Sequence, residues 1–113
     1  MNMQTRQEVE FELGGRTYSV RPTFKKINDI ETRFGAGLPL LNKLLAGQLT
    51  ASEIVGLIHL MIRDQPGAPA LKDLNEIVFE AGIVSWLSVI RDFLDNGLKT
   101  NDVPAKQDAD AGN

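Results

Sequence analysis

The chain has 113 residues, 42% of them hydrophobic, which suffices for one domain with a single buried core and no metal or disulfide support. It contains no cysteine and one histidine, so the residues needed for a disulfide framework, a thiol nucleophile or a zinc site are lacking. The formal charge of -3, without a concentrated run of Lys and Arg, argues against nucleic acid as a partner.

No segment has the character of a membrane span or a secretion signal. The longest apolar run, residues 54–62, is far shorter than the roughly 20 residues that cross a bilayer. The opening residues, MNMQTRQEVE, lack the apolar centre of a signal peptide. Because the absence of cysteine also suits a reducing compartment, we expect a cytoplasmic protein with no membrane partner.

Residues 8–21 carry the pattern of a β-hairpin. Apolar residues alternate with glutamates in the first half, which is the period of a strand with one buried face. Gly14-Gly15 then suits a two-residue turn, because such turns need positive φ angles. Counting outward from this turn pairs Glu8 with Arg21. The same register predicts an apolar face made of Val9, Phe11, Leu13, Tyr18 and Val20.

The chain changes from strand to helix at Arg21-Pro22-Thr23. Thr23 is one candidate for the N-cap residue, and Pro22 as the first helical residue is the alternative. This helix is predicted over residues 23–34 and ends at the glycine that follows. Its apolar stripe, at spacings of three and four, consists of Phe24, Ile27, Ile30 and Phe34.

Apolar periodicity and helix-ending glycines predict four further helices. They cover residues 39–46, 51–63, 70–81 and 83–95. Thr50 and Glu53 form a capping box before the second of these, and Gly97 is read as the stop of the last.

These elements predict an α+β fold in a single domain over residues 1–97. A lone hairpin is marginal in water, so its apolar face must pack on the helices. The expected architecture is an N-terminal antiparallel β-hairpin packed on a bundle of about four to five α-helices. Residues 98–113 are polar and are expected to form a disordered tail.

The sequence shows no group of residues suited to catalysis. Glu8, Glu10 and Glu12 take successive outward positions on a strand, whereas an acid–base pair needs one carboxylate with a shifted pKa. His59 lies among apolar residues and is interpreted as a partly buried, hydrogen-bonded packing residue. Gly35-Ala-Gly37 follows a helix, which is the wrong order for a phosphate-binding loop. We expect no enzyme activity, cofactor, metal or small-molecule substrate.

Three cations crowd the start of the first helix, where the helix dipole disfavours positive charge. The favoured interpretation pairs Arg21 with Glu8 and directs Lys25 and Lys26 into water. The alternative is that these three cations, together with the helix start, receive an acidic group of a partner. Arg21, Lys25 and Lys26 are therefore candidate partner-binding residues.

The helix over residues 51–63 has an apolar face that is too wide for one neighbouring layer. The favoured interpretation is a central core helix surrounded by the others. The alternative is a groove that takes up another chain or a second copy of this one, with Leu57 and Met61 as contacts. The helix over residues 83–95 shows the same excess.

Several short segments in this order resemble a known family. They are YSVRPTF before a helix, DIETRFGAGL, the capped helix TASEIVGLIHLMIR, and NEIVFEAG before a final amphipathic helix. Over roughly residues 8–97 the chain resembles the small tail protein of gene transfer agents and related prophages. That family is grouped with the phage tail assembly chaperones, and its members have also been labelled tail tube proteins.

The resemblance implies a non-enzymatic assembly factor of a phage-like particle in a bacterial host. Such chaperones bind the tape measure protein, keep its apolar helical stretches from aggregating, and release it as tail tube protein polymerises around it. A structural subunit of the tail or neck is the second candidate function, and a small regulatory or nucleic-acid-binding domain is the third. The expected partners are the tape measure protein and then the tail tube protein, and a homo-oligomer stays open.

Overall fold

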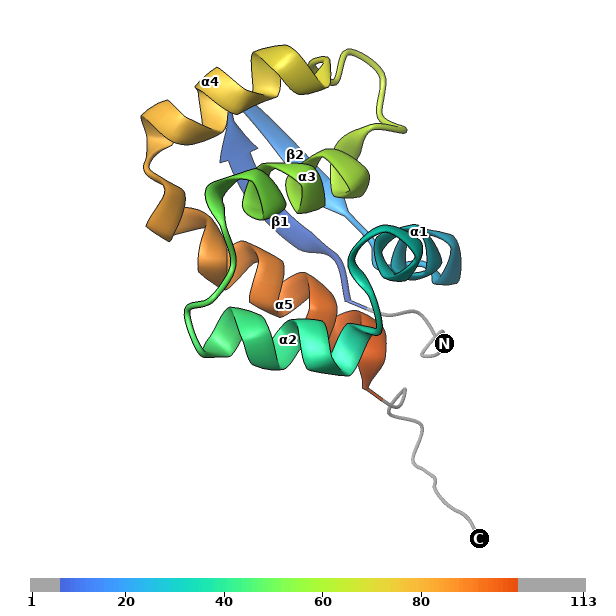
Figure 1. Cartoon of the computed structure of the whole chain (residues 1–113). Helices are drawn as coiled ribbons and strands as arrows, with labels where there is room; N and C mark the ends of the chain where they lie inside the picture. Colours follow the sequence, from blue (N-terminus) through green and yellow to red (C-terminus); the bar gives the residue numbers. More distant parts are fainter. Residues whose placement is uncertain (1–6, 100–113) are drawn as a thin grey trace, which may run out of the picture.

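The N-terminal hairpin forms one layer of the computed structural model, which describes residues 7–99 (Figure 1). Strand β1 spans Val9–Leu13 and strand β2 spans Arg16–Val20. They pair antiparallel in the predicted register. Gly14 and Gly15 at the turn have φ angles of 61° and 78°, which suit glycine and few other residues. The hairpin and its register are confirmed.

Helices make up most of the remaining described chain. In order they are α1 (Phe24–Phe34), α2 (Gly37–Leu45), α3 (Ala51–Ile62), α4 (Leu71–Ala81), the short 3-10 helix η1 (Ile83–Trp86) and α5 (Leu87–Leu98). Within residues 7–99 the architecture is thus one antiparallel hairpin followed by five α-helices, and the predicted α+β class is confirmed.

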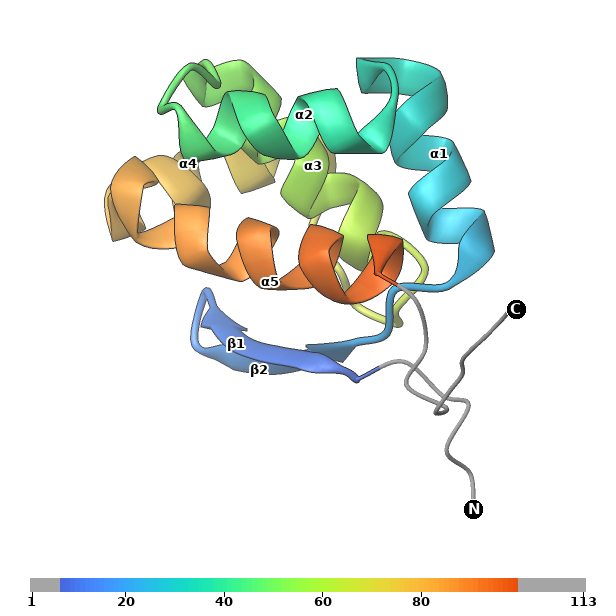
Figure 2. The ribbon, with the colours of Figure 1, turned by 90° about the horizontal axis from the view of Figure 1, so that it is seen from below.

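Helix α5 lies between the hairpin and α2, so Figure 2 shows three layers. Helix α3 lies beside α5 at the centre, and it also contacts α1, α4 and β2. Together α3 and α5 cover the apolar face of the hairpin, which could not be stable alone. Helix α4 packs against α3 on the far side from α2.

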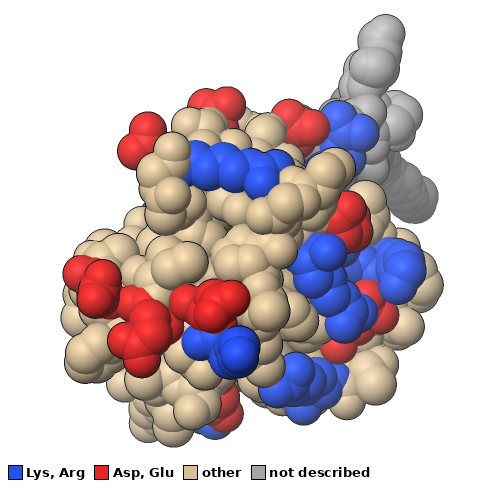
Figure 3. Space-filling view, turned by 90° about the horizontal axis from the view of Figure 1, so that it is seen from above, with Lys and Arg blue, Asp and Glu red and all other residues tan. Residues whose placement is uncertain are grey.

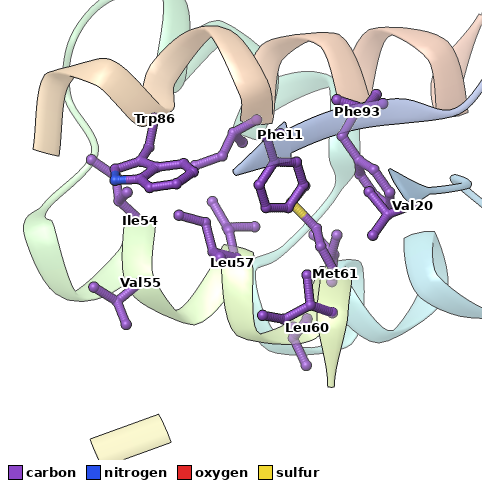
Figure 4. Close-up of a cluster of buried hydrophobic side chains, with 14 of the residues drawn as sticks. Phe11, Val20, Ile54, Val55, Leu57, Leu60, Met61, Trp86 and Phe93 are labelled. Carbon is purple, nitrogen blue, oxygen red and sulfur yellow. The ribbon is translucent and has the colours of Figure 1, made fainter. Parts of the chain in front are cut away.

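Aromatic side chains join the hairpin to the helices (Figure 4). The Phe11 ring stacks on Tyr18 with 5.8 Å between ring centroids, and its edge meets Trp86 at 5.8 Å. Trp86 Nε1 donates a hydrogen bond of 3.3 Å to the carbonyl oxygen of Val78 in α4. The polar atom of the indole is therefore satisfied inside the core.

Helix α3 is buried on all its apolar sides, which confirms the interpretation as a central core helix. Its buried apolar residues are Ile54, Val55, Leu57, Ile58, Leu60, Met61 and Ile62. The apolar excess of the predicted last helix is covered only in part, because Trp86, Ile90, Phe93 and Leu94 are buried whereas Val84 is 77% exposed and Leu87 is partly buried. The fold thus covers the wide apolar face of α3 and leaves some apolar surface open at η1 and the start of α5.

Two predicted helix ends are wrong, and close packing explains both. Helix α2 begins at Gly37 and not at Pro39, and α5 runs through Gly97 to Leu98. A Cβ on Gly97 would lie 2.6 Å from Ile27 Cδ1, and one on Gly37 would lie 2.8 Å from a Leu98 methyl carbon. Both glycines allow helices to approach closely: Gly97 lies inside α5 and does not end it, and Gly37 is the first residue of α2.

Two other expectations also need correction. The apolar stripe predicted for the first helix includes Phe24, yet the side chain of Phe24 is 85% exposed, whereas Ile27 and Ile30 are buried. Leu98 was assigned to the polar tail, yet it is the last residue of α5 and packs against the core. The remaining part of that predicted tail, residues 100–113, lies outside the described residues.

Candidate partner-binding surfaces

The strand-to-helix junction is held together by pairs within the chain. Arg21 Nη2 lies 3.2 Å from Glu8 Oε2 across the hairpin, which confirms the favoured interpretation for this residue. Lys25 Nζ lies 3.1 Å from Asp29 Oδ2, one helical turn away. Thr23 is the N-cap, because its Oγ1 accepts a hydrogen bond of 3.2 Å from the Lys26 backbone amide.

Lys26 is not directed into water, contrary to the expectation. Its side chain is only 12% exposed. Nζ donates to Asp64 Oδ1 at 2.6 Å and to the carbonyl oxygen of Met61 at 2.9 Å. The ammonium group thus satisfies a carbonyl in the last turn of α3, where the helix dipole favours a cation. A lysine at the start of α1 therefore stabilises the end of α3.

Two carboxylates complete the junction. Asp29 Oδ2 also accepts a hydrogen bond of 3.0 Å from Arg63 Nη2, which ties α1 to the end of α3. Hydrogen bonds from Lys25 and then from Arg63 hold the pKa of Asp29 below its usual value, against the opposing effect of desolvation. The hydrogen bond from Lys26 likewise holds the pKa of Asp64 below its usual value.

Basic side chains gather on the side of the molecule where α1 lies, and acidic ones toward the other side (Figure 3). Near α1, a hollow of about 110 Å³ is lined mainly by the paired residues Lys25, Lys26, Asp29, Arg63 and Asp64. An acidic partner there would have to compete with Glu8 and Asp29 for the exposed cations Arg21 and Lys25. The ion pairs at the junction therefore serve to hold α1 against the end of α3.

Leu57 and Met61, the two apolar contact candidates, have no accessible surface. Both side chains point into the core between α3 and its neighbours (Figure 4). A partner could reach them only if helices separated. The structure therefore does not bring them together with Arg21 and Lys25 on one surface.

Large apolar side chains are nevertheless exposed at other places. They are Phe24, Leu38, Leu45, Leu71, Phe79 and Val84, each at least 36% exposed. Leu38 and Leu45 lie on α2, while Phe79 and Val84 flank the turn between α4 and α5. The sequence contained a signal for α2, because its nine residues include five leucines and one face of so short a helix cannot bury five.

Two hollows adjoin the 3-10 helix η1. The larger, about 340 Å³, lies between the end of α2 and the start of α5 and is lined by Leu44, Leu45, Val84, Leu87, Ser88 and Arg91. We call it the α2–η1 groove. The smaller, about 220 Å³, lies between α3 and α4 and is lined by Ala51, Ser52, Val55, Asn75, Glu76, Phe79 and Ile83.

His59 is half-buried on α3, as predicted, but the expected hydrogen bond is missing at one nitrogen. Its Nδ1 is buried and has no hydrogen-bond partner among the described residues. Burial lowers the pKa of His59, and the charges of Arg63 and Arg33 lower it further. The ring is therefore held in its neutral form by its surroundings.

Comparison with protein families gives a match over residues 6–100, to the family described as phage tail tube protein, GTA-gp10. The chain belongs to this family. The match covers the whole of the described fold and confirms the resemblance to a tail protein of gene transfer agents and prophages. A search of curated proteins found no match. A search of solved structures found none either.

The fold adds two observations to the assignment as a phage tail protein. None of the helices within residues 7–99 is long and apolar enough to cross a membrane. Over the same residues, no three His, Asp or Glu side chains are grouped so that they could hold a metal ion. Glu8, Glu10 and Glu12 are exposed on the outward face of β1 and in the residue before it.

Proposed function

We propose that this tail protein is a non-enzymatic assembly chaperone that binds the tape measure protein in the bacterial cytoplasm before the tail is complete. The observation that carries the proposal is the coexistence of a complete core with exposed apolar helix surface. The chain buries its hairpin face and both central helices without a partner, yet Leu38, Leu45 and Val84 remain exposed. A chaperone needs such surface, because it must bind apolar helices and then release them.

The tail tube protein is the second partner in this proposal, since release must be coupled to the subunits that enclose the tape measure protein. Self-association through the same surface is the competing use of exposed apolar area. Measuring the molecular mass at high protein concentration separates the two. A monomer would leave the surface available to other proteins.

A structural subunit of the tail is the second candidate function, and the family description as a tail tube protein favours it. Tubes of this kind are expected to be closed by sheets that continue from one subunit to the next. Within residues 7–99 the only sheet has two strands, and most of the other described elements are helices. This small sheet favours the chaperone over the tube subunit.

Co-expression with the tape measure protein of the same particle tests the proposal. We expect the tape measure protein to become more soluble and to co-purify with this chain. The matched control replaces this chain by an unrelated acidic protein of similar size. Equal solubility in both cultures would contradict chaperone function.

The protein content of purified particles separates the two candidates. A chaperone is lost when the particle matures, whereas a tail subunit remains in many copies. Quantitative mass spectrometry against the major tail protein should therefore find this chain absent or at trace level. A copy number that matches complete rings would establish the structural role.

A further inference from the structure

The α2–η1 groove is an apolar surface that the fold leaves without an internal partner. Leu45 is 63% exposed and Val84 is 77% exposed. Leu44 and Leu87 form the floor, since the first is buried and the second is packed against the core. Exposed and floor residues together give a hollow with apolar walls. Such a surface costs free energy in water unless something covers it.

The groove follows the seam between two antiparallel helices. Gly37 at the start of α2 lies against Leu98 at the end of α5. At the other end of the seam, Leu45 lines the same hollow as Leu87 at the start of α5. The outward face of α2 carries Leu38, and its neighbour Leu41 is only partly buried. The apolar surface therefore continues from the hollow along α2.

The backbone of the groove decides which kind of segment fits. Residues of α2, η1 and α5 use their backbone groups in helical hydrogen bonds, so the groove offers no strand edge. An extended segment placed there would bury its own amide and carbonyl groups without partners. A helix satisfies its backbone internally, and its side-chain ridges fit the furrow between two other helices.

The charged residue at the rim of the groove limits which partner it can bind. Arg91 lines the groove and no Asp or Glu does. Its side chain is 52% exposed, and its guanidinium group contacts Asp92, the next residue. Two copies related by a two-fold axis through the groove would bring two arginines together without adding a carboxylate from the lining. A carboxylate of a partner would have to compete with Asp92, which is 53% exposed, for this arginine, but it would meet no carboxylate from the lining itself.

One candidate within the chain is the C-terminal segment TNDVPAKQDADAGN. It supplies acidic residues, but Val103 is its only large apolar residue. One valine cannot fill the apolar hollow of about 340 Å³. This segment therefore does not suit the groove, and another protein is the better source of the occupant.

We propose that the α2–η1 groove binds an amphipathic helix of the tape measure protein, with an apolar stripe on Leu45, Val84 and Leu87 and a carboxylate paired with Arg91. This inference rests on the proposed chaperone function and adds its location and the chemistry of the bound segment. The stripe needs apolar residues at spacings of three and four, and the acid lies on the flank that faces α5.

Co-purification of the tape measure protein with variants of this chain tests the location. Leu45→Glu and Val84→Glu place a carboxylate in the apolar contact, and each should weaken binding by about tenfold or more. Phe24→Glu is the matched control, because Phe24 is even more exposed than Leu45 and Val84 but lies on α1 outside the groove. It should bind as the wild type does. Circular dichroism must show that all three variants are folded.

Charge reversal tests the acidic flank of the partner. Arg91→Glu should weaken binding by about tenfold or more, and Lys72→Glu on α4 makes the same change in net charge without this effect. Weakening by Lys72→Glu to the same extent would show a general charge effect and would overturn the specific pairing.

The possible results separate the two proposals. If the wild type binds and the groove variants bind equally well, the location is overturned and chaperone function stands. If the wild type does not bind, both are overturned. If the wild type is a dimer that Leu45→Glu converts to a monomer, the occupant is a second copy, and the helix of the tape measure protein is overturned.

Discussion

Lys26 shows how one residue can serve an element other than its own. Read from the sequence, it is an exposed cation in an unfavourable position at the start of α1. In the fold it is almost buried and bonds a carbonyl oxygen and a carboxylate at the end of α3. The local cost at α1 is offset by a contact that sequence spacing does not reveal, because the two partners are 35 and 38 residues away.

We therefore expect Lys26→Met to be clearly more destabilising than Lys25→Met. Removing the Lys26 ammonium leaves a part-buried Met61 carbonyl without its partner, and such losses cost about 1–3 kcal/mol. Lys25 is exposed, and surface changes of this kind stay within about 0.5 kcal/mol. Urea unfolding of the two variants measures the difference. Equal midpoints would show that the buried contact contributes nothing.

His59 predicts a pH dependence of stability in a narrow window. Its pKa lies below the unfolded value of 6.5, chiefly because of burial. The unfolded chain therefore takes up this proton first as the pH falls. Stability from the neutral ring is fully present above pH 6.5 and is lost as the pH falls below 6.5 toward the lower folded-state pKa.

Replacement by glutamine isolates this effect. Asp29, Glu53 and Asp64 also have lowered pKa values, but the ordinary values of these carboxyl groups are already 3.8, 4.5 and 3.8, so their contributions are lost at more acidic pH. Between about pH 7.5 and 5.5 the wild type should lose stability and His59→Gln should lose less. The measurement is the urea midpoint across this range. Parallel curves would exclude His59 as the cause.

Among the helices and strands, those with purely local signals were predicted best. The hairpin register follows from strand alternation and a two-residue turn, so nothing outside residues 8–21 was needed. The capping box is equally local: Thr50 Oγ1 accepts from the Glu53 amide at 3.1 Å, and Glu53 Oε1 accepts from the Thr50 amide at 2.9 Å. Both predictions are confirmed because neighbours in sequence are the interacting groups.

The predictions that failed depended on contacts with other elements. A glycine at the end of an apolar pattern predicts a stop, yet Gly97 is where α5 meets Ile27 and Pro22. The spacing of apolar residues predicts which of them share one face of a helix, but it does not predict which neighbouring element covers that face. The apolar stripe therefore includes Phe24, which is exposed, and the pattern does not reveal the exposure of Leu45 and Val84, which defines the candidate groove.

Gly97→Ala is expected to destabilise the fold, although alanine is the better helix former. An added Cβ would lie 2.6 Å from Ile27 Cδ1 and 3.0 Å from both Ile27 Cγ1 and Pro22 Cβ. Overpacking costs about 1–3 kcal/mol, which exceeds the gain of up to about 1 kcal/mol in helix propensity. Thermal unfolding followed by circular dichroism measures the net effect.

A second substitution checks that the clash is the cause. Ile27→Val removes Cδ1, the atom nearest to the new methyl group, and alone it should cost about 0.5–1.5 kcal/mol. The double variant with Gly97→Ala should lose less stability than the sum of the losses of the two single variants, because the shorter valine side chain at position 27 relieves the close contact. Strict additivity would place the cost elsewhere.

On the scale of the whole molecule, contacts between distant segments make the hairpin part of the helical core. Gln65 Nε2 donates to the Ser19 carbonyl oxygen at 3.0 Å, and Arg16 Nη2 donates to the carbonyl oxygen of Pro66. The loop between α3 and α4 therefore holds β2 from one side, while α5 packs on β1. This arrangement explains how a chain with little sheet covers both central helices and leaves exposed apolar surface at α2 and η1.

The same arrangement predicts that hairpin and helices unfold as one unit. Trp86 is the single tryptophan and its ring meets Phe11 of β1, so its fluorescence reports on the junction of hairpin and helices, while circular dichroism at 222 nm reports on the helices. Both signals should change at the same urea concentration.

Phe11→Leu should lower both midpoints together, by an amount equivalent to about 1 kcal/mol, because it loosens the shared core. Glu10→Gln, on the exposed face of the same strand, should leave them unchanged. A fluorescence transition that precedes the loss of helix would show that the hairpin detaches first, and the apolar residues beneath it on α3 and α5 would then be the surface that a partner could reach.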